Sequence, residues 1–130
     1  MLVVVKKPGE KAERKNISDE IESLQAQVEG YIEFVYIKPL KDRGIFVIVN
    51  DEGKIYDLNP NIVMIDNKYN VVESLVGNVM FTGSRFDEED GPCCDSLSEE
   101  QIEFLNEYVF NNTAKYSCDK GYIIDSVKIV

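Results

Sequence analysis

The residues with the clearest chemical character are nine carboxylates in one short segment. The chain of 130 residues has a formal net charge of −10, and residues 86–107 contain nine acids and no base. These acids are Asp87, Glu88, Glu89, Asp90, Asp95, Glu99, Glu100, Glu103 and Glu107. Carboxylates along a loop and a helix can imitate nucleic-acid phosphates and are attracted to a basic groove. The segment is therefore the candidate partner-binding surface, although the solvated face of any helix carries similar residues.

The same segment has two features that resemble metal sites. The run Asp87–Gly91 offers oxygen ligands, but it lacks the alternating ligands and the later glutamate of an EF-hand loop. Cys93 and Cys94 are adjacent, where a disulfide would be strained, and with Cys118 they make an odd number. We expect no metal, no cofactor and reduced thiols, which indicates a cytoplasmic location.

The composition argues against an enzyme. Histidine is absent, so the commonest general base near neutral pH and every Ser-His or Cys-His nucleophile are missing. No glycine loop with the spacing of a phosphate-binding motif is present. Catalysis by carboxylates alone stays open, but 24 acids make accidental pairs easy to find and single none out. We expect no enzyme and name no catalytic residue.

Aromatic residues give an alternative binding chemistry. Tyr31, Tyr36, Tyr56 and Tyr69 can stack on a nucleotide base, although aromatics of a sheet explain them more simply. Direct nucleic-acid binding is not expected, because the basic cluster between Lys6 and Lys15 is short and the protein is acidic. No apolar run approaches the roughly 20 residues that cross a bilayer, so no membrane association is expected.

Residues 18–58 provide the framework that positions these groups. Ile21, Leu24 and Val28 form a helical stripe, with Ser18 as the expected cap and Gly30 as the expected left-handed terminus. A strand over 31–37 and a central strand over 44–50 follow, and residues 55–58 are expected to return as a hairpin.

Further strands are expected over residues 2–5, 12–17, 77–83 and 122–130, with a turn at 59–61. Residues 71–76 fit a helical turn or a strand equally well. The segment 84–96 is expected to be an irregular, mobile loop. A second helix begins after Leu97, with Ser98 and Gln101 as a capping box and Ile102, Leu105 and Val109 as its buried stripe.

This order of elements predicts one α+β domain over residues 1–130. Its mostly antiparallel sheet carries two helices packed on it. Residues 1–110 form the core of this domain, and residues 111–130 form a C-terminal extension that ends in a strand. A chain of this length buries enough surface for a real core.

Several motifs occur in the order of a known family. They are Pro8–Glu10, Ile21–Glu33, Val49–Lys54, Leu58–Asn61, Gly77–Gly83 and Leu97–Gln101. Together they resemble DUF3846, a small domain-of-unknown-function family of phages, plasmids and integrative elements, over roughly residues 1–110. The resemblance carries no catalytic or binding residues and implies the context of a mobile element.

These observations lead to a functional hypothesis. We expect a non-enzymatic accessory protein of a phage or mobile element that binds and inhibits a host protein, such as a nucleic-acid-binding defence enzyme, through its acidic surface. The first alternative is a protein that binds or sequesters a small nucleotide signal. The second is a structural or regulatory protein of the element.

Overall fold

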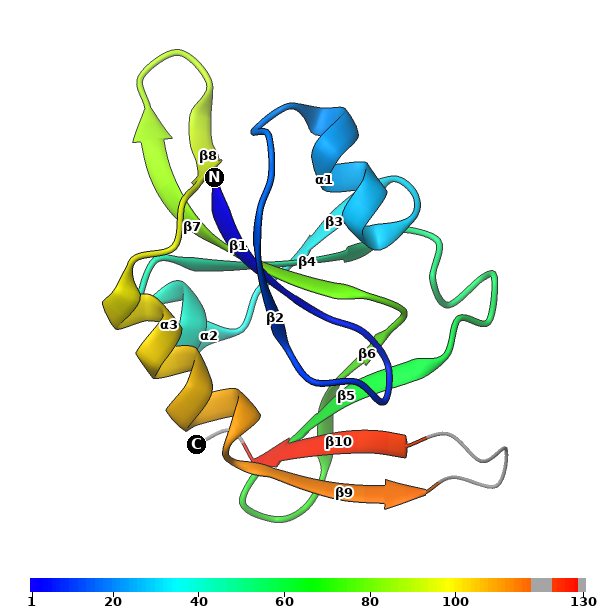
Figure 1. Ribbon diagram of the computed structural model, residues 1–130. Helices are drawn as coiled ribbons and strands as arrows, with labels where there is room; N and C mark the ends of the chain where they lie inside the picture. Colours follow the sequence, from blue (N-terminus) through cyan, green and yellow to red (C-terminus); the bar gives the residue numbers. More distant parts are fainter. Residues whose placement is uncertain (118–122, 129–130) are drawn as a thin grey trace.

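Two β-sheets and three helical segments make up the fold, for which the computed structural model describes residues 1–117 and 123–128. The first sheet contains β1 Leu2–Lys6, β2 Glu13–Asn16, β3 Ile32–Val35, β4 Ile45–Asn50, β7 Val79–Asp87 and β8 Gly91–Asp95. The second contains β5 Pro60–Ile65, β6 Val71–Val76, β9 Thr113–Ser117 and β10 Ile123–Lys128. The helices are α1 Ile21–Val28, α2 Lys38–Lys41 and α3 Glu99–Leu105, which continues as the π-helix η1 Asn106–Phe110 (Figure 1).

The strand order confirms the predicted α+β class. It is β2–β1–β7–β4–β3 in the first sheet, with β8 paired to β7, and β6–β5–β10–β9 in the second. Among the described pairings, only β5 with β10 is parallel. The strands thus divide between two sheets, which the sequence did not predict.

Strand β1 lies in the interior of the first sheet, as its unbroken apolar run predicts. It pairs antiparallel with β2 and with β7. Val3 and Val5 pack with Leu24 and Val28 of α1, whereas Val4 belongs to the larger cluster on the opposite face. Because side chains alternate along a strand, consecutive valines fill two different cores.

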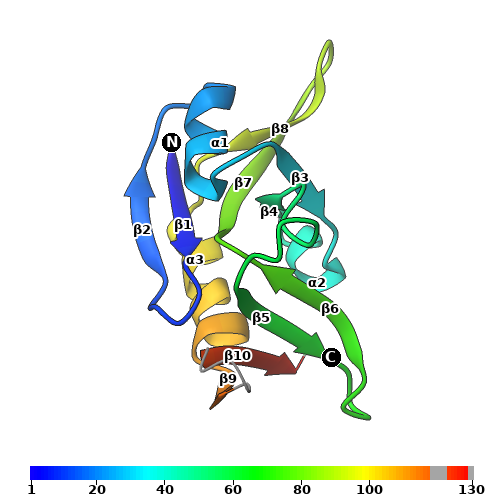
Figure 2. The same cartoon turned by 90° about the vertical axis from the view of Figure 1, so that its right-hand side faces the viewer.

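The larger core lies between the two sheets and the helices α2 and α3 (Figures 1 and 2). The first sheet contributes Val47 and Phe81, the second contributes Met64 and Val127, and α3 contributes Leu105; all five are almost completely buried. One continuous apolar cluster therefore joins the sheets. Removing either sheet would expose the inner face of the other.

Helix α3 begins as the sequence predicts. Ser98 Oγ accepts a hydrogen bond from the Gln101 amide at 3.1 Å, and Gln101 Oε1 accepts one from the Ser98 amide at 2.9 Å. The capping box therefore satisfies the amides of Ser98 and Gln101 at this end. The predicted buried stripe is confirmed at Ile102, Leu105 and Val109.

A buried ion pair connects the sheets. The ammonium of Lys6 in β1 lies 2.9 Å from the carboxylate of Asp125 in β10, and both residues are at most 3% exposed. Lys6 also donates to Asn61 Oδ1 at 3.1 Å, and Lys115 donates to the second oxygen of Asp125 at 3.0 Å. Burial would raise the pKa of Asp125, but the hydrogen bonds from these lysines outweigh it and lower that pKa. The pair stabilises the docking of β10, since either charge alone would be buried without compensation.

The helix predicted over residues 18–30 is present as α1, but both of its ends differ from the prediction. Glu20 is the N-cap, and Ser18 Oγ accepts a hydrogen bond only from the Glu20 amide, at 3.1 Å. Glu29, with φ of 61°, is the left-handed residue at the C-terminus. Gly30 has another role, because a Cβ there would lie 2.5 Å from Nδ2 of Asn50. Within the predicted stripe, Ile21 is 46% exposed.

The hairpin predicted between β4 and residues 55–58 is wrong. Residues 51–57 form a turn closed by a hydrogen bond from the Leu58 amide to the Gly53 carbonyl at 2.9 Å. Strand β4 pairs with β3 and β7, so that Ile48 lies opposite Met80. The apolar start of β7 covers β4 better than Ile55 and Tyr56, which are exposed.

The second sheet holds most of the remaining differences. The turn predicted at residues 59–61 is wrong at Pro60 and Asn61, which belong to β5. Asn61 is buried and donates to the carbonyls of Lys6 and Gly77 at 2.7 and 2.8 Å. Residues 71–76 form β6, and α2 and β9 were not predicted. The final predicted strand is present as β10, with residues 122, 129 and 130 outside the described residues.

Candidate functional site

The first part of the acidic segment, up to Asp95, lies in a β-hairpin. This hairpin corrects the irregular loop expected over residues 84–96. Strand β7 continues to Asp87 and pairs antiparallel with β8. At the tip, Asp87 Oδ1 accepts hydrogen bonds from the amides of Glu89 and Asp90 at 2.8 and 3.1 Å. The bonds from Asp90 and Glu89, helped by the charge of Arg85, lower the pKa of Asp87. Backbone pairing and this aspartate turn build the hairpin without an apolar pattern.

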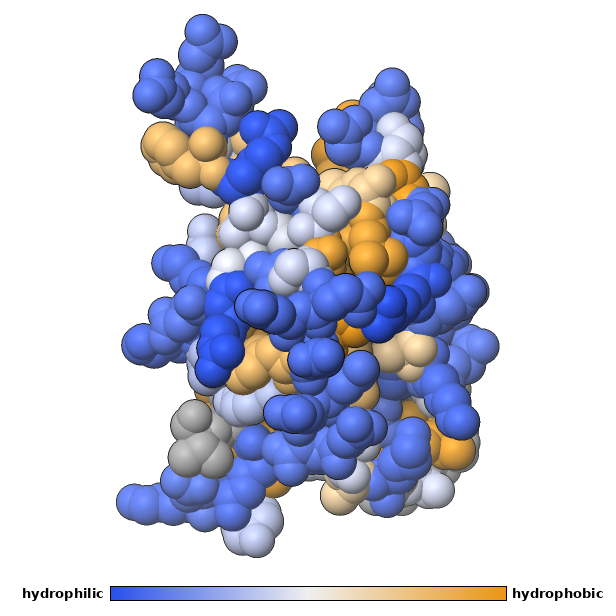
Figure 3. Space-filling view, turned by 60° about the vertical axis from the view of Figure 1, so that its left-hand side comes forward, coloured by the Kyte–Doolittle hydropathy of each residue, from blue (hydrophilic) through white to orange (hydrophobic). Residues whose placement is uncertain are grey.

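The tip of this hairpin, Glu88–Asp90, stands out from the body of the molecule. Figure 3 shows it as a hydrophilic projection above the face that contains α3. All three tip residues are exposed, and Phe86, next to them on β7, is 76% exposed. An exposed aromatic residue therefore lies beside the projecting charged turn.

The carboxylates of α3 form a separate group. Glu99 is paired with the guanidinium of Arg14 through two bonds, at 3.0 and 3.1 Å, whereas Glu100, Glu103 and Glu107 are exposed. Helix α3 runs from the base of the hairpin away from its tip (Figures 1 and 2). The nine candidate acids therefore do not form one compact patch. Asp95, at the base of the hairpin, accepts a hydrogen bond from the Ser96 amide at 2.8 Å.

The cysteines of the hairpin are free thiols. Cys94 is half-buried against the cluster under α1, and this burial raises the pKa of its thiol. Cys93 lies on the neighbouring position of β8, with its sulfur 3.4 Å from the Gly91 carbonyl. A raised thiol pKa lowers the fraction of the reactive thiolate. Cys118 lies outside the described residues.

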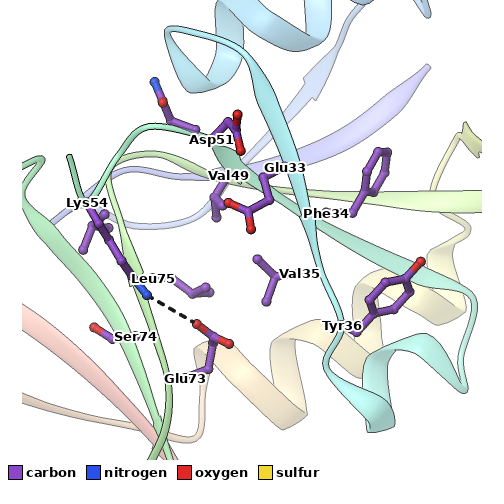
Figure 4. A pocket seen from close by; sticks show the side chains of 12 residues that line it. Glu33, Phe34, Val35, Tyr36, Val49, Asp51, Lys54, Glu73, Ser74 and Leu75 are labelled. Atoms are coloured by element: carbon purple, nitrogen blue, oxygen red, sulfur yellow. Dashed lines mark ion pairs between the residues drawn. The ribbon is translucent and has the colours of Figure 1, made fainter. Parts of the chain in front are cut away.

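A polar cleft of about 310 Å³ separates β3 and β4 from β6. Figure 4 shows Glu33 and Glu73 pointing into it from opposite sides, with Lys54 4.0 Å from Glu73. The aliphatic side chains of Val35 and Leu75 lie between these charged groups (Figure 4). With Asp51, which also lines the cleft, three carboxylates and one ammonium over an aliphatic floor favour a polar or cationic occupant.

The four candidate tyrosines do not gather at one site. Tyr31 and Tyr56 line the same hollow, whereas Tyr36 borders the polar cleft with its ring turned away from it (Figure 4). The ammonium of Lys41 lies 4.6 Å from the centre of the Tyr36 ring. Tyr69 lies in the turn between β5 and β6, with the ammonium of Lys128 5.2 Å from its ring centre. Only the first pair could share a ligand.

Within residues 1–117 and 123–128, no three His, Cys, Asp or Glu residues lie together so as to hold a metal ion. None of the helices in this part of the chain is long and apolar enough to cross a membrane.

A family model decides the classification of the chain. The model described as Domain of unknown function (DUF3846) matches residues 1–109, which is most of the sequence. The chain belongs to the DUF3846 family. No curated protein and no solved structure matches it. The DUF3846 match ends within η1, so β9 and β10, including Asp125, follow the matched region.

Some site residues carry no sequence signal. Glu29 and Glu52 line one hollow, and Glu33 and Glu73 line the cleft, although each pair is separated by more than one element of the DUF3846 fold. The members of each pair come together only in the folded structure, where the elements that carry them pack around β4. The hairpin, by contrast, is contiguous, so its acidic run was visible in the sequence.

Proposed function

We propose that this DUF3846 protein is a non-enzymatic accessory protein of a phage or mobile element, and that it binds and inhibits a host protein in the cytoplasm. The observation that carries the proposal is the β7–β8 hairpin, whose exposed tip consists of carboxylates beside an exposed Phe86. The partner is a protein with a basic surface, such as a defence enzyme that acts on nucleic acid.

Electrostatics supports this kind of partner. A projecting group of like charges attracts a basic groove over several ångströms before contact, which raises the association rate. An adjacent aromatic ring adds contact area once the surfaces meet. Because the attraction is between exposed charges, binding of this kind weakens as salt is added.

The experiment that tests the proposal uses charge reversal at the tip. Glu88, Glu89 and Asp90 are changed to lysine, and Asp87 is kept because its carboxylate holds the turn. The matched control, called the α3 variant, reverses Glu100 and Glu103 of α3 and Glu107 of η1, which changes the net charge equally away from the hairpin. Both variants and the parent protein are used to capture proteins from a host lysate at low and high salt.

The expected result is one host protein that the parent and the α3 variant retain and the tip variant loses. Its capture is expected to fall at high salt. Inhibition is then measured on that purified host protein. Equal capture by the tip variant, or capture insensitive to salt, would overturn the assignment of the hairpin.

The alternative, a protein that sequesters a nucleotide signal, rests on Tyr31 and Tyr56, which line one hollow. A thermal-shift panel of nucleotides tests it, since a ligand that binds only the folded state raises the melting temperature. A role as a structural or regulatory protein of the element is a further alternative, and no particular residue favours it.

A further inference from the structure

A second candidate site lies on the side of the molecule away from the hairpin. It is a hollow of about 280 Å³ between the C-terminus of α1 with the start of β3 and the turn that follows β4. In Figure 1 this turn and the hairpin lie on opposite sides of the molecule. The walls include Glu29, Tyr31, Glu52, Tyr56 and Leu58.

The floor of the hollow is fixed by one buried amide. Nδ2 of Asn50 donates to the carbonyls of Val28 and Glu29 at 3.1 and 3.2 Å, and its Oδ1 accepts from the Glu52 amide at 2.8 Å. The Gly30 position has no room for a side chain beside this amide. Asn50 thus ties the helix end to the turn, so both walls are held in place before any ligand arrives.

The groups on these walls share one electrostatic preference. Tyr31 and Tyr56 are each 67% exposed as residues, and the face of a tyrosine ring attracts cations. Glu29 and Glu52 add two carboxylates, and none of the described residues that line the hollow is a lysine or an arginine. The C-terminus of α1 contributes the negative end of its dipole.

Neighbouring groups also favour a cation in the hollow. The Tyr56 phenol bonds to the Glu52 carboxylate, which raises the pKa of Tyr56 and keeps the phenol neutral. The adjacent polar cleft shares Asn50 with the hollow, and among its described lining residues Glu33, Asp51 and Glu73 stand against one base, Lys54. A phosphate would be repelled here, whereas a cation meets carboxylates and ring faces together.

We propose that this hollow binds a guanidinium or ammonium group, held between Tyr31 and Tyr56 and neutralised by Glu29 and Glu52. The group belongs to a free small cation or to a basic side chain of a partner. This site is independent of the hairpin, and the inference stands or falls separately from the proposed function.

The test is a titration of the ¹⁵N-labelled full chain with arginine amide, followed by amide chemical shifts. The arginine amide is acetylated at its α-amino group, so that the guanidinium is its single charge. Citrulline amide acetylated in the same way is the uncharged control, and adenosine monophosphate tests the anionic alternative. We expect arginine amide to move the signals of Gly30, Tyr31, Glu52 and Tyr56. Glu52→Gln and Tyr31→Ala are each expected to weaken this response about fivefold.

Matched variants outside the hollow are Glu22→Gln and Tyr69→Ala, which are expected to leave the response unchanged. The spectrum of each variant also reports whether it is folded. A short peptide with a central arginine distinguishes the sources, because tighter binding than arginine amide indicates a partner side chain and equal binding indicates a free cation.

Several results of these titrations would overturn the proposal. These are shifts spread evenly over the acidic surface, an equal response to citrulline amide, and a response that persists in both hollow variants. Stronger shifts at the same residues with adenosine monophosphate would also overturn it and would favour the nucleotide alternative.

Discussion

Asp125 is the residue whose replacement is expected to affect stability most. In Asp125→Asn the buried ammonium of Lys6 loses its counter-charge, which is expected to lower the free energy of unfolding by about 3–5 kcal/mol. Lys115→Ala is the control, because this partner is 57% exposed and its loss is expected to cost less than about 1 kcal/mol. Denaturant unfolding measures both, and similar costs would contradict the role assigned to the buried pair.

The pH dependence of unfolding follows from the same residue. The pKa of Asp125 is lowered in the folded protein, so its contribution is complete above the unfolded value of about 3.9. It is lost as the pH falls through the lower folded value. The difference in unfolding free energy between the parent and Asp125→Asn is therefore expected to narrow below about pH 4. A difference that stays constant down to pH 2 to 3, roughly, would contradict the lowered pKa.

Gly30→Ala tests the close approach of Asn50 to the chain. The new Cβ would lie 2.5 Å from Asn50 Nδ2, so the amide must shift and give up hydrogen bonds to Val28 and Glu29. We expect a loss of about 1–3 kcal/mol in unfolding free energy. The backbone at Gly30 does not need a positive φ, so the contact alone is tested. An unchanged unfolding midpoint would show that Asn50 adjusts without cost.

For single residues, the sequence predicted which residues are special better than it predicted their structural roles. It identified Gly30 as special but assigned the left-handed backbone to it rather than to Glu29. The true requirement is a contact with Asn50, 20 positions later in the chain. Local propensity carries no information about such a contact.

Among the elements, the two helix starts provide a matched comparison. Ser98→Ala removes a complete capping box and is expected to cost about 1 kcal/mol in unfolding free energy. Ser18→Ala removes a hydroxyl that bonds only to the nearby Glu20 amide, and it is expected to lower the unfolding free energy by only a few tenths of a kcal/mol. Equal losses in urea unfolding would contradict the assignment of Glu20 as the cap of α1.

The elements that were predicted correctly have signals within one short window. The buried strands β1 and β4 are unbroken apolar runs, and α3 has a capping box and a buried stripe. The hairpin of β7 and β8 was not predicted because its side chains are polar, and main-chain pairing alone defines it. The partner of β4 was also missed, since the choice between residues 55–58 and β7 is made by tertiary packing.

At the scale of the whole molecule, β9 and β10 follow the region matched by the DUF3846 model but complete the second sheet. A chain that ends at Asn112 would lose Asp125 and would uncover Ile62 and Met64 of β5. We expect it to be unfolded or to lose most of its stability, about 5 kcal/mol or more. Circular dichroism with thermal unfolding measures this. A cooperative transition near that of the full chain would contradict an integral second sheet.

Whether a candidate site could be predicted depends on how its residues are spaced along the chain. The acidic tip was predicted as a charged segment because its residues are contiguous, but its projection from the body was not. The hollow of Tyr31 and Tyr56 was not predicted, since its walls come from segments on either side of β4. The charge of the hairpin tip could therefore be predicted from the sequence, whereas the hollow of Tyr31 and Tyr56 could not.

The most direct test of the hairpin proposal is the salt dependence of binding to the captured host protein. The dissociation constant is measured by titration calorimetry at salt concentrations from about 50 to about 200 mM for the parent and for Glu88→Lys/Glu89→Lys/Asp90→Lys. We expect the affinity of the parent to fall steadily with salt, and we expect the variant not to bind measurably at the lowest salt. Equal dissociation constants and equal salt dependence for the two proteins would contradict it.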